Sequence, residues 1–261
     1  MILLQKYILL ILFDIDIREL IHLNDVENSF SLGPNSSFLY CFDFLYKNIE
    51  WLLDKIKANK EKYFILDTPG QIEIFTQSQS FKEIIKKLTN HKELDMRLCV
   101  VNLIESSNVL DLSRYVFSIM NVLNAMIFLE LPQINIISKI DLLKDYDQSS
   151  MHFPLSFYKN PNDSDILKQA IDESNVNPKF KKLNTLLCDF VIEYGLVAFD
   201  TLSVQNQKQL NKIAALVDKA NGYIYMDTGS LKDEKYIEIR NQIARNDLDF
   251  DHDDDENMEH L

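Results

Sequence analysis

Glycine is scarce in this chain: the 261 residues include only five glycines, and the first of them is Gly33. Loops that bind phosphate use glycine heavily, because their backbone N–H groups have to approach the anion closely. A glycine-rich phosphate loop is therefore excluded from residues 1–32.

Cysteine and positive charge are limited too. The three cysteines are scattered and form no Cys-x-x-Cys pair, so neither a disulfide framework nor a zinc site is indicated, and a reducing compartment fits.

The net charge is -13, and residues 246–261 contribute -8 of it with eight acids and no Lys or Arg. The remaining body, at -5, does not have the charge of a nucleic-acid surface. We expect 246–261 to be a solvated, disordered tail, the alternative being an acidic docking segment.

A long hydrophobic run is also lacking at the start of the chain. Residues 1–13 are mostly Ile, Leu, Tyr and Phe, but a membrane-spanning helix needs about 20 apolar residues. No small-residue cleavage site follows before Asp14, as a signal peptide would require. A strand or a misread start of the sequence is preferred over a membrane anchor.

Along the rest of the chain, short continuous apolar runs alternate with segments whose apolar residues recur at helical spacing and so form a stripe along one helix face. Continuous apolar runs predict strands buried on both faces; they cover 63–66, 98–104, 134–137 and 196–199. Apolar residues at spacings of three and four predict helices over 38–56, 115–129 and 180–194, with a last helix ending at Ala220. This alternation predicts an α/β fold of three layers with a mostly parallel sheet. We expect one domain over 1–245, with a polar insertion at 145–181.

The first apolar run ends in Asp67-Thr68-Pro69-Gly70-Gln71. Open parallel sheets bind ligands outside the carboxyl ends of their strands. A carboxylate at position 67 can hold Mg²⁺, usually through water, and Gly70 lets an N–H approach a terminal phosphate. Gln71 can orient a water. The alternative is a strand that ends in a Pro-Gly turn.

The third run leads directly into Ser138-Lys139-Ile140-Asp141. A carboxylate here can accept two hydrogen bonds from guanine, from N1–H and the exocyclic amine, while the lysine stem lies along the ring. Such charge-assisted bonds contribute about 1.5–3 kcal/mol each and can decide guanine over adenine. The alternative is a strand followed by the N-cap of a helix. The residue types of 201–204, after the fourth run, do not by themselves assign a role.

A Gly33-Pro34-Asn35 triplet precedes the first helical stripe. By itself it predicts a turn that opens a helix, with Asn35 or one of the serines after it as N-cap.

Together, these three motifs resemble those of the GPN-loop GTPases in order and spacing. The resemblance covers roughly 14–230, and three further stretches, 17–21, 129–135 and 216–223, look most like the second paralogue of that family. It implies a fold of P-loop NTPase type and a GTPase that binds GTP or GDP with Mg²⁺. It also implies a homodimer, or a heterodimer with a paralogue, with a shared active site.

The resemblance implies a role for each matching residue. Asn35, at the tip of the Gly33-Pro34-Asn35 loop, would stabilise phosphoryl charge on the partner subunit's nucleotide. The other implied roles are metal binding by Asp67 and Asp16, contact with the terminal phosphate by Gly70, water positioning by Gln71 and Glu73, and base recognition by Ser138, Lys139 and Asp141. The implied partners are RNA polymerase II subunits or assembly factors, in the cytoplasm with shuttling to the nucleus. No direct contact with nucleic acid or membrane is implied.

One part of the family pattern is missing, because no Gly-x-x-Gly-x-Gly-Lys-Ser/Thr loop occurs upstream of Asp67. Two hypotheses follow. In the first, the protein is a GTP hydrolase and this sequence has lost roughly sixty residues, the size of a strand-loop-helix-strand unit. In the second, the chain is a non-catalytic binding or dimerisation module. The first is favoured because Asn35, Gln71 and Asp141 keep residue types that nucleotide chemistry requires. In either case we expect no GTP turnover by the 261 residues alone.

Overall fold

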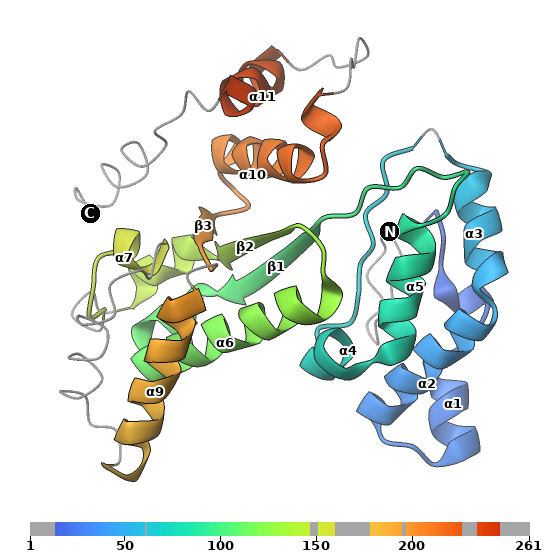
Figure 1. Cartoon of the computed structure of the whole chain (residues 1–261), viewed down its shortest axis with the longest axis horizontal. Coiled ribbons are helices and arrows are strands. Elements are labelled where there is room, and N and C mark those ends of the chain that lie inside the picture. The colour runs from blue at the N-terminus through green and yellow to red at the C-terminus, as the bar shows by residue number, and fades with distance from the viewer. Residues whose placement is uncertain are drawn as a thin grey trace. The chain divides into compact units, whose positions relative to one another are not determined.

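The computed structural model describes residues 14–60, 62–146, 151–159, 178–194, 197–225 and 234–245. The chain divides into two compact units, Met1–Arg97 with Ile127–Leu129, and Leu98–Met126 with Glu130–Leu261. Figure 1 shows the helices and strands of each unit. The predicted tail and most of the predicted insertion lie outside the described residues, and the single domain over 1–245 stays a prediction.

All regular secondary structure in the described part of the first unit is helical. Its elements are η1 (Ile17–Glu19), α1 (Leu23–Phe30), α2 (Pro34–Lys47), α3 (Ile49–Lys57), α4 (Ile72–Gln77) and α5 (Gln79–Thr89). Helix α2 packs against α1 and α5. The rings of Phe42 and Phe81 meet edge to face between α2 and α5, with centroids 5.2 Å apart, so the predicted apolar stripe of α2 is indeed a core face.

The single helix predicted over 38–56 is interrupted at Asn48. This residue leaves the helical conformation, with φ -112° and ψ 34°, and ends α2 while α3 begins immediately after it. Its side-chain Nδ2 donates to the Phe44 carbonyl at 2.9 Å. Asparagine side chains compete with the helix for backbone groups in this way, which an apolar periodicity alone does not reveal.

The strand predicted at 63–66 is wrong. These residues are extended but belong to no strand, and Tyr63 and Ile65 are 56% and 62% exposed. A strand needs a neighbour to accept its N–H groups and donate to its carbonyls. Among the described residues, the sheet contains only later segments, so this apolar run has no ladder to join.

The second unit contains a parallel three-stranded sheet in the order β1 (Val100–Glu105), β2 (Gln133–Ser138), β3 (Phe199–Leu202). Three of the four predicted strands are thereby confirmed, although β3 lies about three residues later than expected. The polar Asp200 falls inside β3, where it pairs with Lys212 at 2.8 Å, and so the apolar pattern did not extend over this strand.

Helices cover both faces of the sheet, as Figure 1 shows. The helical elements of this unit are η2 (Ser106–Leu110), α6 (Leu112–Leu129, except its last three residues, which belong to the first unit), η3 (Ile140–Asp145), α7 (Leu155–Lys159), α9 (Pro178–Tyr194), α10 (Gln207–Ala220), η5 (Tyr223–Tyr225) and α11 (Glu234–Arg245). Ile104 and Ile137 of neighbouring strands form one core with α6, whereas Ile136 forms a second core with Ile213 of α10 on the opposite face. The predicted three-layer α/β arrangement is confirmed.

Helix α6 is long and apolar enough to cross a membrane by length and composition, the one such helix in the described part of the chain. However, its buried side chains Tyr115, Ile119 and Leu123 belong to the core of the second unit together with sheet residues. Core helices of water-soluble domains pass the same length test, so α6 is explained by packing on the sheet.

Candidate functional site

The carboxyl ends of the three strands lie side by side in the second unit. Glu105 of β1 pairs in register with Ser138 of β2, which in turn pairs with Leu202 of β3. Because the strands are parallel, the loops that follow them leave from one edge of the sheet. This edge therefore carries the predicted base-recognition motif, and we refer to residues 138–141 as the base turn.

The base turn is tied to the end of β1 by side-chain hydrogen bonds. Ser138 Oγ donates to the Ile104 carbonyl at 2.8 Å, and Ser106 Oγ donates to the Lys139 carbonyl at 2.9 Å. Lys139 has φ 59° and ψ 37°, the left-handed region that residues with a side chain rarely adopt. The reversal at Lys139 turns the chain from β2 directly into η3.

The ammonium group of Lys139 contacts Glu105, with Nζ 2.9 Å from Oε1. Hydrogen bonding from Lys139 lowers the pKa of the Glu105 carboxyl below its ordinary value, and the positive charge adds to this effect. The carboxylate of Glu105 is therefore ionised at neutral pH and holds the lysine at the end of β1.

Asp141 lies in the first turn of η3 and is half-buried. Among the residues that the structure describes, no hydrogen bond or ion pair engages its carboxylate. A carboxylate that no group of its own chain satisfies is available to accept two donors from a ligand. This is the property that guanine recognition by Asp141 requires.

The residues predicted to bind the metal, the terminal phosphate and the attacking water lie in the first unit, and we refer to Asp67, Gly70, Gln71 and Glu73 as the phosphate-side residues. Asp67 is half-buried, and within the described part of the chain its carboxylate has no hydrogen-bond or ion-pair partner. Gln71 is the N-cap residue of α4, and its side-chain Oε1 is buried without a hydrogen-bond partner there. An unsatisfied buried amide oxygen is costly unless water or a ligand group pairs with it. Glu73 lies on α4, and its side chain is outside the described residues.

The Gly33-Pro34-Asn35 loop opens α2, as predicted, but the prediction of Asn35 or a following serine as N-cap is wrong, because the helix already begins at Pro34. Gly33 is the N-cap residue, Pro34 occupies the first helical position and Asn35 is exposed in the first turn. Ser37 secures the turn because both its N–H and its Oγ donate to the Gly33 carbonyl at 3.0 Å. The Asn35 amide thus points away from its own core, in a position that another molecule can reach.

Nothing in this chain's own geometry requires glycine at two of the predicted site positions. A Cβ added at Gly33 or Gly70 would meet no atom within 4 Å, and neither residue has a positive φ. The packing and backbone of the described residues therefore do not explain why these two positions are glycine.

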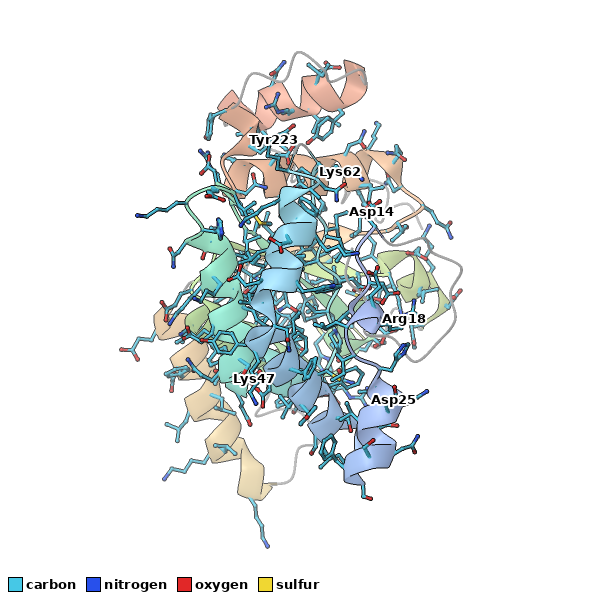
Figure 2. The ribbon with its side chains drawn as sticks, turned by 90° about the vertical axis from the view of Figure 1, so that its right-hand side faces the viewer. Asp14, Arg18, Asp25, Lys47, Lys62 and Tyr223 are labelled. Carbon is cyan, nitrogen blue, oxygen red and sulfur yellow. The ribbon has the colours of Figure 1, made fainter. Side chains whose placement is uncertain are left out.

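Asp16 already has a cationic partner. It caps η1 by accepting from the Arg18 N–H at 2.9 Å, and Arg18 Nε donates to its two oxygens at 3.0 and 2.8 Å. These bonds lower the pKa of Asp16, with the side-chain contact to Arg18 as the largest cause. Nearby, Asp14 and Lys62 form an ion pair at 3.4 Å; Figure 2 labels both residues and Arg18. Asp16 as a metal ligand stays a prediction, because it would have to exchange or share Arg18.

Sequence reasoning missed Glu105 and Ser106. Both follow directly on an apolar run, the same signal that singled out Asp67, but their role depends on the pairing of β1 with β2.

A single site that contains both the phosphate-side residues, Asp67 and Gln71, and the base turn stays a prediction, because these residues belong to different units.

A parallel sheet between two helix layers, with a Lys-x-Asp motif at the end of its middle strand, is the open α/β arrangement expected of a P-loop NTPase type fold. The crystal structure of PAB0955, a GTPase in apo form from Pyrococcus abyssi, is similar, with a TM-score of 0.59 at 20% sequence identity. The match covers 78% of this chain and 77% of that one, and it confirms the fold class.

Sequence comparison then gives the family. Residues 12–223 match the family model described as "Conserved hypothetical ATP binding protein". GPN-loop GTPase QQT1 of Arabidopsis thaliana is 39% identical over 212 residues, which are 81% of this chain and 70% of that protein. GPN-loop GTPase 3 of Kluyveromyces lactis is 39% identical over 206 residues, 79% of this chain and 73% of the relative. The chain belongs to the GPN-loop GTPase family.

The second paralogue is represented among the relatives as well. GPN-loop GTPase 2 of Xenopus tropicalis is 32% identical over 214 residues, 82% of this chain and 69% of that protein. Relatives of paralogues two and three thus match over similar lengths of this chain, and the resemblance to paralogue two in particular stays a prediction.

Proposed function

We propose that this protein binds guanine nucleotides at the base turn and hydrolyses GTP in a dimer whose two subunits share each active site. The observation that carries the proposal is the carboxylate of Asp141, which has no partner among the described residues and follows a lysine held at the end of β1. Two donors on one edge distinguish guanine from adenine, and Asp141 offers the matching acceptor pair. The family's relatives are named GTPases, which agrees with this choice over the ATP of the family model's description.

The phosphate-side residues support hydrolysis. The carboxylate of Asp67 has no partner within the described ranges, and it is a hard oxygen ligand of the kind Mg²⁺ prefers, directly or through water. The ion would neutralise phosphate charge there. The buried, unsatisfied Oε1 of Gln71 is placed to accept a hydrogen bond from a water. Gly70 gives the backbone the room to approach a phosphate oxygen.

The shared active site rests on Asn35. Its amide is exposed at the start of α2, on a loop whose glycine is not required by packing. In a dimer, the Asn35 N–H₂ group would donate to phosphoryl oxygens of the nucleotide bound by the partner subunit. A donor supplied in trans acts like an arginine finger, with a smaller effect because the amide is neutral.

Replacing Asn35 with alanine tests the shared site in a form of the protein that carries the family's phosphate loop and turns over GTP. We expect hydrolysis to slow by about 10²-fold, the usual effect of deleting one donor to transition-state charge, with GTP affinity unchanged. Phosphate release and nucleotide titration measure the two quantities. Ser36→Ala, in the same exposed turn, is the matched control. Equal turnover by Asn35→Ala and its parent would contradict the shared-site proposal.

For the 261 residues alone we expect no measurable GTP turnover. The sequence contains no glycine-rich loop with a lysine before Asp67, and no such group offsets the charge of the β and γ phosphates. Phosphate release from purified protein with GTP and Mg²⁺ measures this. Hydrolysis above the buffer blank, and abolished by Gln71→Ala, would show the expectation to be wrong.

The missing loop also favours a second candidate function, that of a non-catalytic module which binds a nucleotide or a paralogous GTPase. Genomic DNA upstream of the coding sequence distinguishes the two: an in-frame segment with a phosphate loop supports the hydrolase, and a transcript shown to start at Met1 supports the module.

For either function we propose paralogous GPN-loop GTPases and RNA polymerase II subunits or assembly factors as partners, in the cytoplasm with shuttling to the nucleus. Co-purification with polymerase II subunits tests this assignment.

A further inference from the structure

Lys139 occupies a backbone conformation that its residue type disfavours. With φ 59° it is one of few positive-φ residues with a side chain in the described part of the protein, and glycine or asparagine is the usual occupant of this region. Such a conformation persists only where surrounding groups determine it, and it concentrates at functional sites. The question is therefore which groups hold Lys139.

The last residue of β1, Glu105, and the first residue of η2, Ser106, contact the ammonium group and the backbone carbonyl of Lys139. Ser106, which is only 1% exposed, donates its hydroxyl to the Lys139 carbonyl at 2.9 Å. Glu105 accepts a hydrogen bond from the Lys139 Nζ at 2.9 Å. These partners lie 33 and 34 residues before Lys139 in sequence, and only the parallel pairing of β1 with β2 brings them together.

We propose that Glu105 and Ser106 are positioning residues for guanine recognition: Ser106 fixes the turn that presents Asp141, and Glu105 fixes the direction of the Lys139 stem. This inference rests on the proposed function, because it assigns a purpose to the base turn. Neither residue is proposed to touch the nucleotide. Ser106 acts through the base turn, and Glu105 acts through the side chain of Lys139.

The physical reason lies in the flexibility of lysine. Its four-carbon stem carries a large rotamer entropy, which is lost when the stem packs along the face of a base. A lysine whose ammonium is already held by Glu105 has lost part of that freedom before the nucleotide arrives, and preorganisation of this kind raises affinity. The same contact contributes little to folding, because the Lys139 and Glu105 side chains are 58% and 50% exposed.

Replacing Glu105 separates positioning from a structural role. We expect Glu105→Ala to weaken GDP binding by about two- to tenfold, the effect of one newly mobile side chain, with a smaller loss for Glu105→Gln, which keeps an acceptor for Lys139. ADP affinity and the melting temperature should not change. Titrations followed by ¹H–¹⁵N NMR on the 261-residue protein measure dissociation constants into the millimolar range. Glu93→Ala, which removes an exposed carboxylate 3.6 Å from Lys57, is the matched control.

Ser106→Ala supplies a second readout that does not need nucleotide. Loss of its hydroxyl should shift the Lys139 and Asp141 amide resonances and speed their hydrogen exchange in the free protein. Ser118→Ala, which removes an ordinary hydroxyl bond to the Arg114 carbonyl within α6, should leave them in place.

The outcomes distinguish the inference from the function on which it rests. If the parent prefers GDP over ADP and Glu105→Ala keeps its full GDP affinity, the positioning role is wrong while guanine binding stands. If the parent shows no preference for GDP, the proposed function itself is wrong. If the parent prefers GDP and both Glu105→Ala and Ser106→Ala behave as expected, the inference is supported.

Discussion

Asp141→Asn is expected to exchange guanine for xanthine at the base turn. The mutant keeps the size of the side chain but presents one donor and one acceptor where the carboxylate presents two acceptors. Xanthine carries an oxygen in place of the exocyclic amine, so its edge matches the amide. Loss of a charge-assisted bond of about 1.5–3 kcal/mol should weaken GDP binding by roughly 10- to 100-fold, while XDP binding should become tighter than in the parent.

The gain in XDP affinity is the informative half of this result, because a merely damaged protein would bind neither nucleotide better. NMR or calorimetric titration with GDP and XDP measures both affinities in the 261-residue protein. The matched control is Asp145→Asn, an exposed carboxylate at the other end of the same 3-10 helix. An unchanged preference for GDP in Asp141→Asn would remove Asp141 from base recognition.

Ile119→Ala should lower the free energy of unfolding by about 2–5 kcal/mol. Ile119 is fully buried in the core that α6 forms with the sheet, and a large-to-small change there loses burial and leaves a cavity. On the same helix, Phe117 is 64% exposed, so Phe117→Ala should change stability by no more than about 0.5 kcal/mol.

Urea denaturation followed by circular dichroism measures this pair of variants. The contrast also tests the assignment of α6 as a core helix: if the helix lay in a membrane or faced the opposite way, the two variants would not differ in this direction. A larger loss of stability for Phe117→Ala than for Ile119→Ala would contradict the observed face of α6.

Much of the second unit could be predicted from the sequence. The runs at 98–104 and 134–137 are β1 and β2, and the helical stripe at 115–129 is α6, because buried parallel strands and a helix packed on them leave strong apolar patterns. The base turn lies at the carboxyl end of β2, where the pattern placed it. Its neighbours Glu105 and Ser106 could not be predicted, since their contact with Lys139 depends on strand register.

Other features depended on contacts that a linear pattern does not contain. The run at 63–66 has the composition of a buried strand, but among the described residues no strand pairs with it. At the break, Asn48 leaves the helical conformation and its side chain donates to the Phe44 carbonyl, which the apolar pattern does not reveal. The left-handed conformation of Lys139 runs against the preference of its residue type and is set by the end of β1.

The most direct test of guanine recognition is a pair of ¹H–¹⁵N NMR titrations of the unmodified 261-residue protein, with GDP and with ADP. We expect GDP to shift the amide resonances of Lys139 and Asp141 and to bind at least about tenfold more tightly than ADP, the discrimination that one charge-assisted donor–acceptor match supplies. Equal affinities for the two nucleotides, or GDP-induced shifts that leave the base turn unaffected, would contradict it.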